Sequence, residues 1–446
     1  MNIEFPKLRP LDVQPHQQGG QPPMLLLRDP LGLTDQMLAI PQQLAPLLAL
    51  CDGMHDQVGI LTALRVRWGI PITRQALREI VDTLDEACLL ESERSAAAMA
   101  AALAAYRAEP SRPLTLAGGG YPADPSALSD YLEAFDPADR LLAEPSSHNG
   151  IVRGLISPHI DYSRGGPIYR AAWQAASAAA RSADLAIIFG TDHSGGLGRV
   201  TLTQQSYATP YGVLPNALGV TGAVADALGE EDAYAEELHH RHEHSIELAA
   251  VWLHHVRQGN PIEVVPILCG SFAHFVAGQA DPAHDTRIAK TIDALTGATG
   301  GRSVLVIAAA DLAHIGPAFG GAPAHAEQRA VLRRADEALL AQMSAGDAEG
   351  FFGALRDVGD RNNVCGLPPI YMALRFLGDV RGAAVAEIDQ RRTDRGAALR
   401  DGDAGQDQPV GQQRPGSRGG DREDQPQRPH RTDERGRRDR TDAGQC

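Results

Sequence analysis

The stretch that decides the fold is IVRGLISPHIDYSRGG, residues 151–166. Its apolar run ends at Ser157-Pro158, His159 and Asp161 follow at once, and a helix-like stretch begins at about residue 167. This order predicts a buried strand, a polar turn and then a helix. Ligands of open α/β sheets bind just beyond the carboxyl ends of strands, so we expect His159 to lie in a binding site. Taken alone, such a histidine is more often a capping or turn residue.

Strand-like and helix-like runs alternate from about residue 113 to 390. Runs of strand length lie at 151–157, 184–190, 199–203, 262–268 and 303–309. Helices are expected at 167–181, 219–229, 244–257, 285–296, 325–344 and 367–377. Continuous apolar strands between helices are typical of a sheet covered on both faces. We therefore predict an α/β fold, with a three-layer α/β/α domain at 113–390 around a mostly parallel or mixed sheet.

The first 110 residues have a different pattern. Residues 1–22 are rich in proline, glutamine and glycine, which predicts a disordered N-terminus. A possible strand and several helical patterns follow at 24–28, 41–51, 57–68 and 73–87. We predict that residues 23–110 form a small winged-helix-like module. Its arginines alternate with acidic residues, which favours a protein or peptide partner over DNA.

The character of the chain changes completely at about residue 391. Residues 391–446 contain 13 arginines but no Ile, Phe, Tyr, Trp or Met, so this segment cannot form a core. We predict a disordered low-complexity tail. A GC-rich gene that is read in a shifted frame after codon 390 would give this composition. A natural disordered tail is the alternative, and the nucleotide sequence distinguishes the two.

Composition restricts the classes of function. The net charge of −15 argues against a surface that coats nucleic acid. Five scattered cysteines form no CxxC pair and no disulfide framework, which fits a reducing compartment. The N-terminus lacks the apolar core of a signal peptide, and no apolar run is long enough to span a bilayer. We expect a cytoplasmic protein with no nucleic-acid or membrane partner.

Further polar residues lie where His159 lies, at the ends of predicted elements. His193 follows the second predicted strand, and Asp311 and His314 follow the last one. Cys365 precedes the last predicted helix, whose N-terminal dipole would lower the pKa of the thiol and favour thiolate. Imidazoles and a thiolate that converge from separate elements can bind a transition metal such as Fe, Cu or Zn. We predict one shared metal centre; the alternative is a set of unrelated turn residues.

A histidine-rich stretch, HHRHEHSIE, contains Glu243, His244 and Glu247. It lacks the HExxH order of zinc proteases, so we do not expect it to be the metal site itself. On a helix, Glu247 would share a face with both Glu243 and His244. We assign these three residues to the pocket wall, where the glutamates would bond to ligand histidines or to neighbouring backbone. Asp161 and Asp192, close in sequence to the predicted ligands, complete this supporting set.

With these residues in view, the domain at 113–390 resembles the Memo family, also called AmmeMemoRadiSam system protein B. The resemblance implies an α/β/α fold similar to that of class III extradiol dioxygenases, which hold non-haem Fe(II). The motifs that carry it are, in chain order, Ala117-Gly118, Tyr121-Pro122-Ala-Asp124-Pro125, Pro158-His159, Gly190-Thr-Asp-His193, Thr209-Pro210-Tyr-Gly212, Glu243-His-Ser-Ile-Glu247, Asp311-Leu-Ala-His314 and Cys365-Gly366.

The resemblance also implies roles for the site residues. His159, His193 and Cys365 match metal-binding positions, and His314 matches a ligand or acid–base histidine. We predict that His314 and Asp311 are catalytic. Ring-cleaving relatives use two histidines and one carboxylate, and Cys365 looks like the replacement for the carboxylate. A soft thiolate suits copper or redox iron, so we expect Fe(II) or Cu as the cofactor rather than plain ring-cleavage chemistry.

Two functions remain in competition. The first is a metal-dependent redox enzyme that activates dioxygen or superoxide, with His314 moving protons. The second is a non-catalytic module that binds a small molecule, peptide or partner protein in the same cleft. The resemblance implies a modification pathway shared with radical-SAM and AMMECR-type proteins. We do not expect a hydrolase or nucleotide-binding protein, because the chain has no GxSxG, Walker A or GxGxxG signature.

Overall fold

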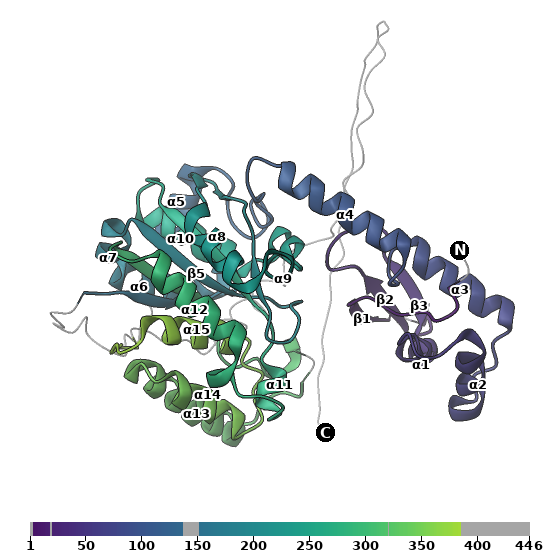
Figure 1. The fold of residues 1–446 in the computed structure, drawn as a ribbon. Helices are drawn as coiled ribbons and strands as arrows, with labels where there is room; N and C mark the ends of the chain where they lie inside the picture. The colour runs from purple at the N-terminus through teal and green to yellow at the C-terminus, as the bar shows by residue number, and fades with distance from the viewer. Residues whose placement is uncertain (1–2, 18–19, 137–150, 320, 385–446) are drawn as a thin grey trace, which may run out of the picture. The chain divides into compact units, whose positions relative to one another are not determined.

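The computed structural model describes residues 3–17, 20–136, 151–319 and 321–384 (Figure 1). The tail at 391–446, for which the sequence predicts disorder, lies outside these residues. In the part of the chain that is described, no helix combines the length and the apolar character needed to cross a membrane.

A five-stranded sheet forms the centre of the larger domain, with its strands in the order β4-β10-β5-β9-β6. The first four strands are parallel, and β6 runs antiparallel to β9. The bounds are Gly154–Ser157 (β4), Leu185–Thr191 (β5), Val200–Leu202 (β6), Glu263–Cys269 (β9) and Val304–Ala309 (β10). The predicted sheet, mostly parallel and mixed at one edge, is confirmed. A separate hairpin is formed by Tyr207–Thr209 (β7) and Gly212–Leu214 (β8).

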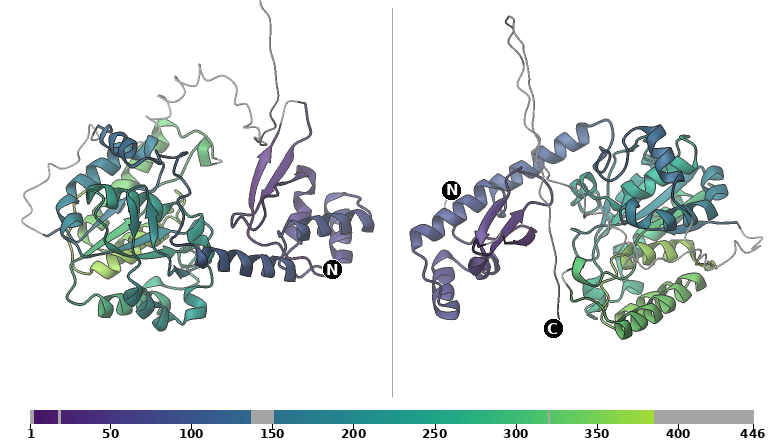
Figure 2. Two further views of the ribbon diagram at one scale, coloured as in Figure 1. Left: turned by 90° about the horizontal axis from the view of Figure 1, so that it is seen from above. Right: turned by 180° about the vertical axis from the view of Figure 1, so that it is seen from behind.

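Each strand sends alternate side chains into two apolar cores, one on each face of the sheet. In the fully buried β5, Leu185, Ile187 and Phe189 join one core, while Ala186 and Ile188 join the other. Helices cover both faces, as Figures 1 and 2 show, and the predicted α/β/α arrangement is therefore confirmed. Burial on both faces explains why these strands are continuously apolar in sequence.

The helices of one face are Pro125–Glu133 (α5), Tyr162–Ala175 (α6), Ser177–Ser182 (α7) and Ser245–Val256 (α10). Those of the other face are Leu218–Leu228 (α8), Thr286–Ala298 (α12), Ala326–Ala345 (α13), Ala348–Arg356 (α14) and Leu367–Leu377 (α15). Short helical turns complete the domain at Glu230–Ala233 (α9), Glu237–Arg241 (η2), Ala273–Val276 (α11), Pro282–His284 (η3) and Pro317–Phe319 (η4).

The N-terminal region contains a three-stranded antiparallel sheet followed by helices. Its elements are Asp12–His16 (β1), Met24–Arg28 (β2), Leu38–Pro41 (β3), Gln42–Leu44 (η1), Ala45–Leu50 (α1), Gln57–Trp68 (α2), Arg74–Glu86 (α3) and Glu93–Ala108 (α4). A separate apolar core of leucines, isoleucine and valine lies among them. The classification as a winged-helix-like module stays a prediction.

The prediction that residues 1–22 are disordered is wrong for the described part of that range. Strand β1 pairs with β2 along its whole length, from Asp12 opposite Arg28 to His16 opposite Met24. Just before it, Arg9 forms a buried ion pair with Asp29 and donates a hydrogen bond of 2.7 Å to the carbonyl of Cys88. Backbone pairing and a buried charge pair order a segment whose composition alone is typical of a loop.

Candidate metal centre

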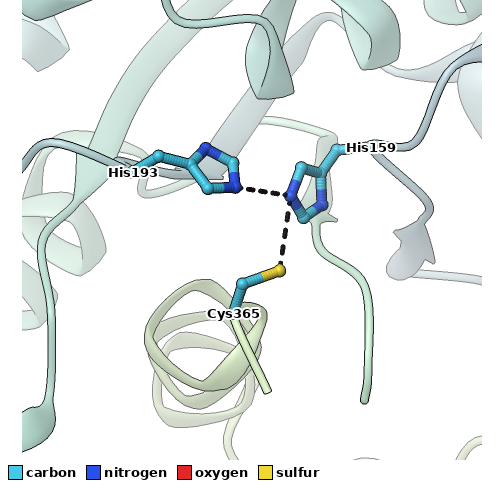
Figure 3. Close-up of side chains that lie close together, drawn as sticks. All are labelled: His159, His193 and Cys365. Atoms are coloured by element: carbon cyan, nitrogen blue, oxygen red, sulfur yellow. Dashed lines mark hydrogen bonds between the residues drawn. The ribbon is translucent and has the colours of Figure 1, made fainter. Parts of the chain in front are cut away.

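Parallel strands bring their carboxyl ends to one edge of the sheet, and this edge gathers the predicted ligands. His159 follows β4, His193 follows β5, and Asp311 and His314 follow β10. Cys365 approaches from the other direction, just before α15. The side chains of His159, His193 and Cys365 point toward one another, as Figure 3 shows.

Three donor atoms surround one point. His159 Nε2 lies 3.2 Å from His193 Nε2 and 3.4 Å from Cys365 Sγ, and all three atoms lie within 4.8 Å of one another. Donor atoms held about 2.0–2.3 Å from one tetrahedral ion are about 3.3–3.6 Å apart. The observed separations therefore fit three ligands of one transition-metal ion, and two imidazoles with a thiolate form a donor set that such ions accept.

His159 is suited to be a neutral ligand. Its side chain is 2 % exposed, and this burial lowers the pKa of the imidazole to about 4, so the ring is uncharged near neutral pH. Its Nδ1 is buried, has no hydrogen-bond partner among the described residues, and lies 3.7 Å from Asp311 Oδ2. Asp311 Oδ1 accepts a hydrogen bond of 3.2 Å from the backbone N–H of His159. A carboxylate beside the outer nitrogen is the usual support of a metal-ligating histidine.

Glu243 fixes the orientation of His193. Its Oε2 lies 3.0 Å from His193 Nδ1 and accepts a hydrogen bond of 3.1 Å from the backbone N–H of His193. Its Oε1 accepts hydrogen bonds from the backbone N–H groups of His244 and Ser245, at the start of α10. Burial by itself would lower the pKa of His193, but the bond to Glu243 and its charge raise it. The His193 ring also stacks on His244, with centroids 5.0 Å apart.

The expectation of an intrinsically acidic Cys365 is wrong. Burial raises the pKa of this thiol well above its ordinary value, and the charge of Asp311 raises it further. Desolvation of the thiolate and the nearby carboxylates outweigh the dipole of α15. The thiol therefore stays protonated near neutral pH until a cation takes the place of its proton.

His314 lies beside the three converging residues. Its Nε2 is 3.7 Å from Cys365 Sγ, and its Nδ1 is 2.9 Å from the carbonyl oxygen of Leu312. Because a carbonyl only accepts hydrogen bonds, Nδ1 carries the proton of the neutral ring. The lone pair of Nε2 then faces the thiol, so His314 can accept a proton from this side of the centre.

Comparison with known proteins identifies the family of the chain. A family model described as Memo-like protein matches residues 112–396. The chain belongs to the Memo-like family. A MEMO1 family protein of Aquifex aeolicus is 24 % identical over 325 residues, which cover 71 % of this chain and 77 % of the relative. A MEMO1 family protein of Thermus thermophilus is 25 % identical, with 72 % and 89 % covered, and one of Thermococcus onnurineus is 27 % identical, with 61 % and 89 % covered.

The structure of this Memo-like chain gives Asp161 and Glu247 other partners than the predicted pocket. Asp161 caps α6 and accepts hydrogen bonds from the backbone and side chain of Arg164. Glu247 is fully buried, forms an ion pair with Arg112, and accepts a hydrogen bond of 2.5 Å from the Tyr121 hydroxyl. It also accepts a hydrogen bond of 3.0 Å from the backbone N–H of Leu116, so it does bond to neighbouring backbone as predicted, but not to a ligand histidine. Glu247 therefore fastens the start of the domain to α10.

The predicted sharing of one helical face by Glu243, His244 and Glu247 is not observed. Glu243 and His244 precede α10, which begins at Ser245, so the helical spacing to Glu247 does not hold. Arg112, the buried partner of Glu247, was missed because nothing in its sequence context marks it as buried.

Asp192 is buried, and its carboxylate pairs with another histidine. Its Oδ2 lies 2.9 Å from Nδ1 of His239, a residue for which the sequence pattern predicts no role. Glu236, also missed, brings a carboxylate to the same place. The available signal was the pair of glycines after His193, which allows these carboxylates to approach the loop.

Proposed function

We propose that this Memo-like protein binds Fe(II) or copper through His159, His193 and Cys365 and acts as a dioxygenase-like oxidoreductase. The observation that carries the proposal is the convergence of two imidazole nitrogens and one sulfur at 3.2 and 3.4 Å. Histidine and cysteine donors suit both metals. The bound ion would supply one-electron chemistry toward dioxygen or superoxide.

The residues around the centre have separate roles in this proposal. Glu243 orients His193, and Asp311 holds the backbone of His159. His314 moves protons at Nε2, because that atom faces the Cys365 side of the centre. Asp311 assists by its negative charge beside both His159 and the thiol.

Metal analysis of anaerobically purified protein tests the proposal. The wild-type chain should contain one Fe or Cu ion and should consume dioxygen or superoxide. His159→Ala and Cys365→Ser should each lose stoichiometric metal while the circular dichroism spectrum is unchanged. His284→Ala and Cys88→Ser are matched controls, since His284 is exposed and Cys88 belongs to the N-terminal region. Full metal content in both ligand variants would refute the assignment.

Oxygen and superoxide assays separate the two functions that the sequence left open. Stoichiometric metal without any consumption would leave the metal site standing and favour the non-catalytic, partner-binding function. We further propose that the protein works in the cytoplasm beside radical-SAM and AMMECR-type proteins. The family assignment and the unpaired state of the four described cysteines support this proposal. Failure of co-expressed partners to copurify or to change turnover would count against it.

A further inference from the structure

A second group of possible metal ligands lies beside the first but shares none of its residues. It consists of Asp192 after β5, Glu236 just before η2, and His239 within η2. Each side chain offers one donor atom, and the three atoms lie within 4.8 Å of one another. The side chains of Asp192 and His239 are 1 % and 12 % exposed, so this group is not a loose surface cluster.

Two glycines make room for the carboxylates. A Cβ atom at Gly195 would lie 2.7 Å from the carboxylate of Asp192, and one at Gly196 would lie 2.8 Å from Glu236 Oε1. Side chains at these positions would therefore displace the two acids. The loop contributes hydrogen bonds instead: the N–H of Gly196 donates to both oxygens of Glu236, at 3.2 and 3.1 Å, and the N–H of Ser194 donates to Asp192 Oδ1.

The two carboxylates of the cluster face a single basic side chain within it, that of His239. Among the described residues, no lysine or arginine forms an ion pair with Asp192 or Glu236, and His239 is the ion-pair partner of Asp192. A simple His–Asp pair would explain Asp192 and His239, and the N–H of Gly196 holds the second carboxylate, that of Glu236, beside them. A cation bound in place of the proton between Asp192 and His239 would be coordinated by all three side chains.

We propose that Asp192, Glu236 and His239 form a second cation site, which binds a divalent ion of the Mn²⁺ or Zn²⁺ type. Two carboxylates and one imidazole suit harder and borderline ions, whereas the thiolate of the first centre selects softer ones. Mn²⁺, which thiolates bind poorly, should therefore distinguish the two sites although Asp192 and His193 are consecutive. Asp192 and His239 also line a small cavity together with Ser194, His242 and Glu243.

The experiment uses the full chain with the first centre removed by His159→Ala and Cys365→Ser. Mn²⁺ is titrated and the free ion is followed by electron paramagnetic resonance; Zn²⁺ is titrated by calorimetry as the second probe. We expect this parent to bind one ion. Asp192→Asn, Glu236→Gln and His239→Ala should each weaken binding by at least about tenfold. Glu231→Gln and His284→Ala change exposed side chains of the same types and should leave the affinity unchanged.

The outcomes distinguish this site from the first one. A parent that binds neither Mn²⁺ nor Zn²⁺ overturns the inference, and so does a set of three variants that bind as tightly as the parent. If Asp192→Asn alters the circular dichroism spectrum, the conservative Glu236→Gln at a less buried position decides the question. Because the first centre is absent throughout, failure here leaves the proposed iron or copper site untouched, and success does not depend on it.

Discussion

Metal binding at the first centre should strengthen as pH rises, by close to tenfold per pH unit between about pH 7 and 8.5. This slope corresponds to the release of one proton for each ion that binds. Burial and Asp311 keep the Cys365 thiol protonated, so an ion that binds the thiolate must displace that proton. His159 releases none, because burial lowers its pKa to about 4 and the ring is already neutral. One proton per ion is worth about 1.4 kcal/mol of binding free energy per pH unit.

The increase of metal affinity with pH should become steeper at acidic pH. Glu243 raises the pKa of His193 despite burial, so below that pKa a second proton must leave before the ring can bind. Competition with a chromophoric chelator over a series of pH values gives the slope, and an indicator dye in weak buffer counts released protons. In Cys365→Ser, the weak affinity that remains in titration should not change with pH above pH 7. An affinity that does not change with pH in the wild type, or a slope that survives in Cys365→Ser, would refute this reasoning.

Three further outcomes are expected. Arg112→Ala leaves the buried Glu247 carboxylate unpaired and should cost about 3–5 kcal/mol of unfolding free energy in urea, whereas Arg164→Ala, at a half-exposed pair, should cost less than about 1 kcal/mol. Glu243→Gln frees the ring of His193 and should weaken metal binding about 10–100-fold in a chelator competition assay, with the exposed Glu231→Gln as control. Fluorescence anisotropy with duplex DNA should show no binding of the full chain at physiological salt.

Most of the fold could be predicted because its signals are local. The strand β5 is buried at all seven positions, and a continuous apolar run bounded by polar residues identifies such a strand. The helix Gln57–Trp68 begins after Asp56, which caps it, and ends at Gly69 in a left-handed conformation. Strand β1 was missed because Asp12–His16 contains proline and glutamine, and its order depends on backbone pairing with the next strand, β2.

The candidate site was predictable to the extent that it follows from topology. His159 and His193 come directly after parallel strands, so their proximity follows once the sheet is known. The state of Cys365 could not be predicted, because its pKa depends on burial and on Asp311, more than fifty residues away in sequence. The ion pair between Arg112 and Glu247 joins two chain segments whose contact no spacing rule indicates.

The position of His193 depends on the protein rather than on the metal. Two contacts hold its loop against the segment that includes η2. Asp192 Oδ2 lies 2.9 Å from His239 Nδ1, and His193 Nδ1 lies 3.0 Å from Glu243 Oε2. Glu243 in turn caps the first residues of α10, a helix buried along most of its length, and the loop itself leaves the fully buried β5. A ligand held from both sides by rigid elements loses little conformational freedom when an ion binds. Asp192 and His193 are consecutive but belong to different clusters. The contacts of both clusters therefore stabilise the same loop, and each cluster limits the movement of the other.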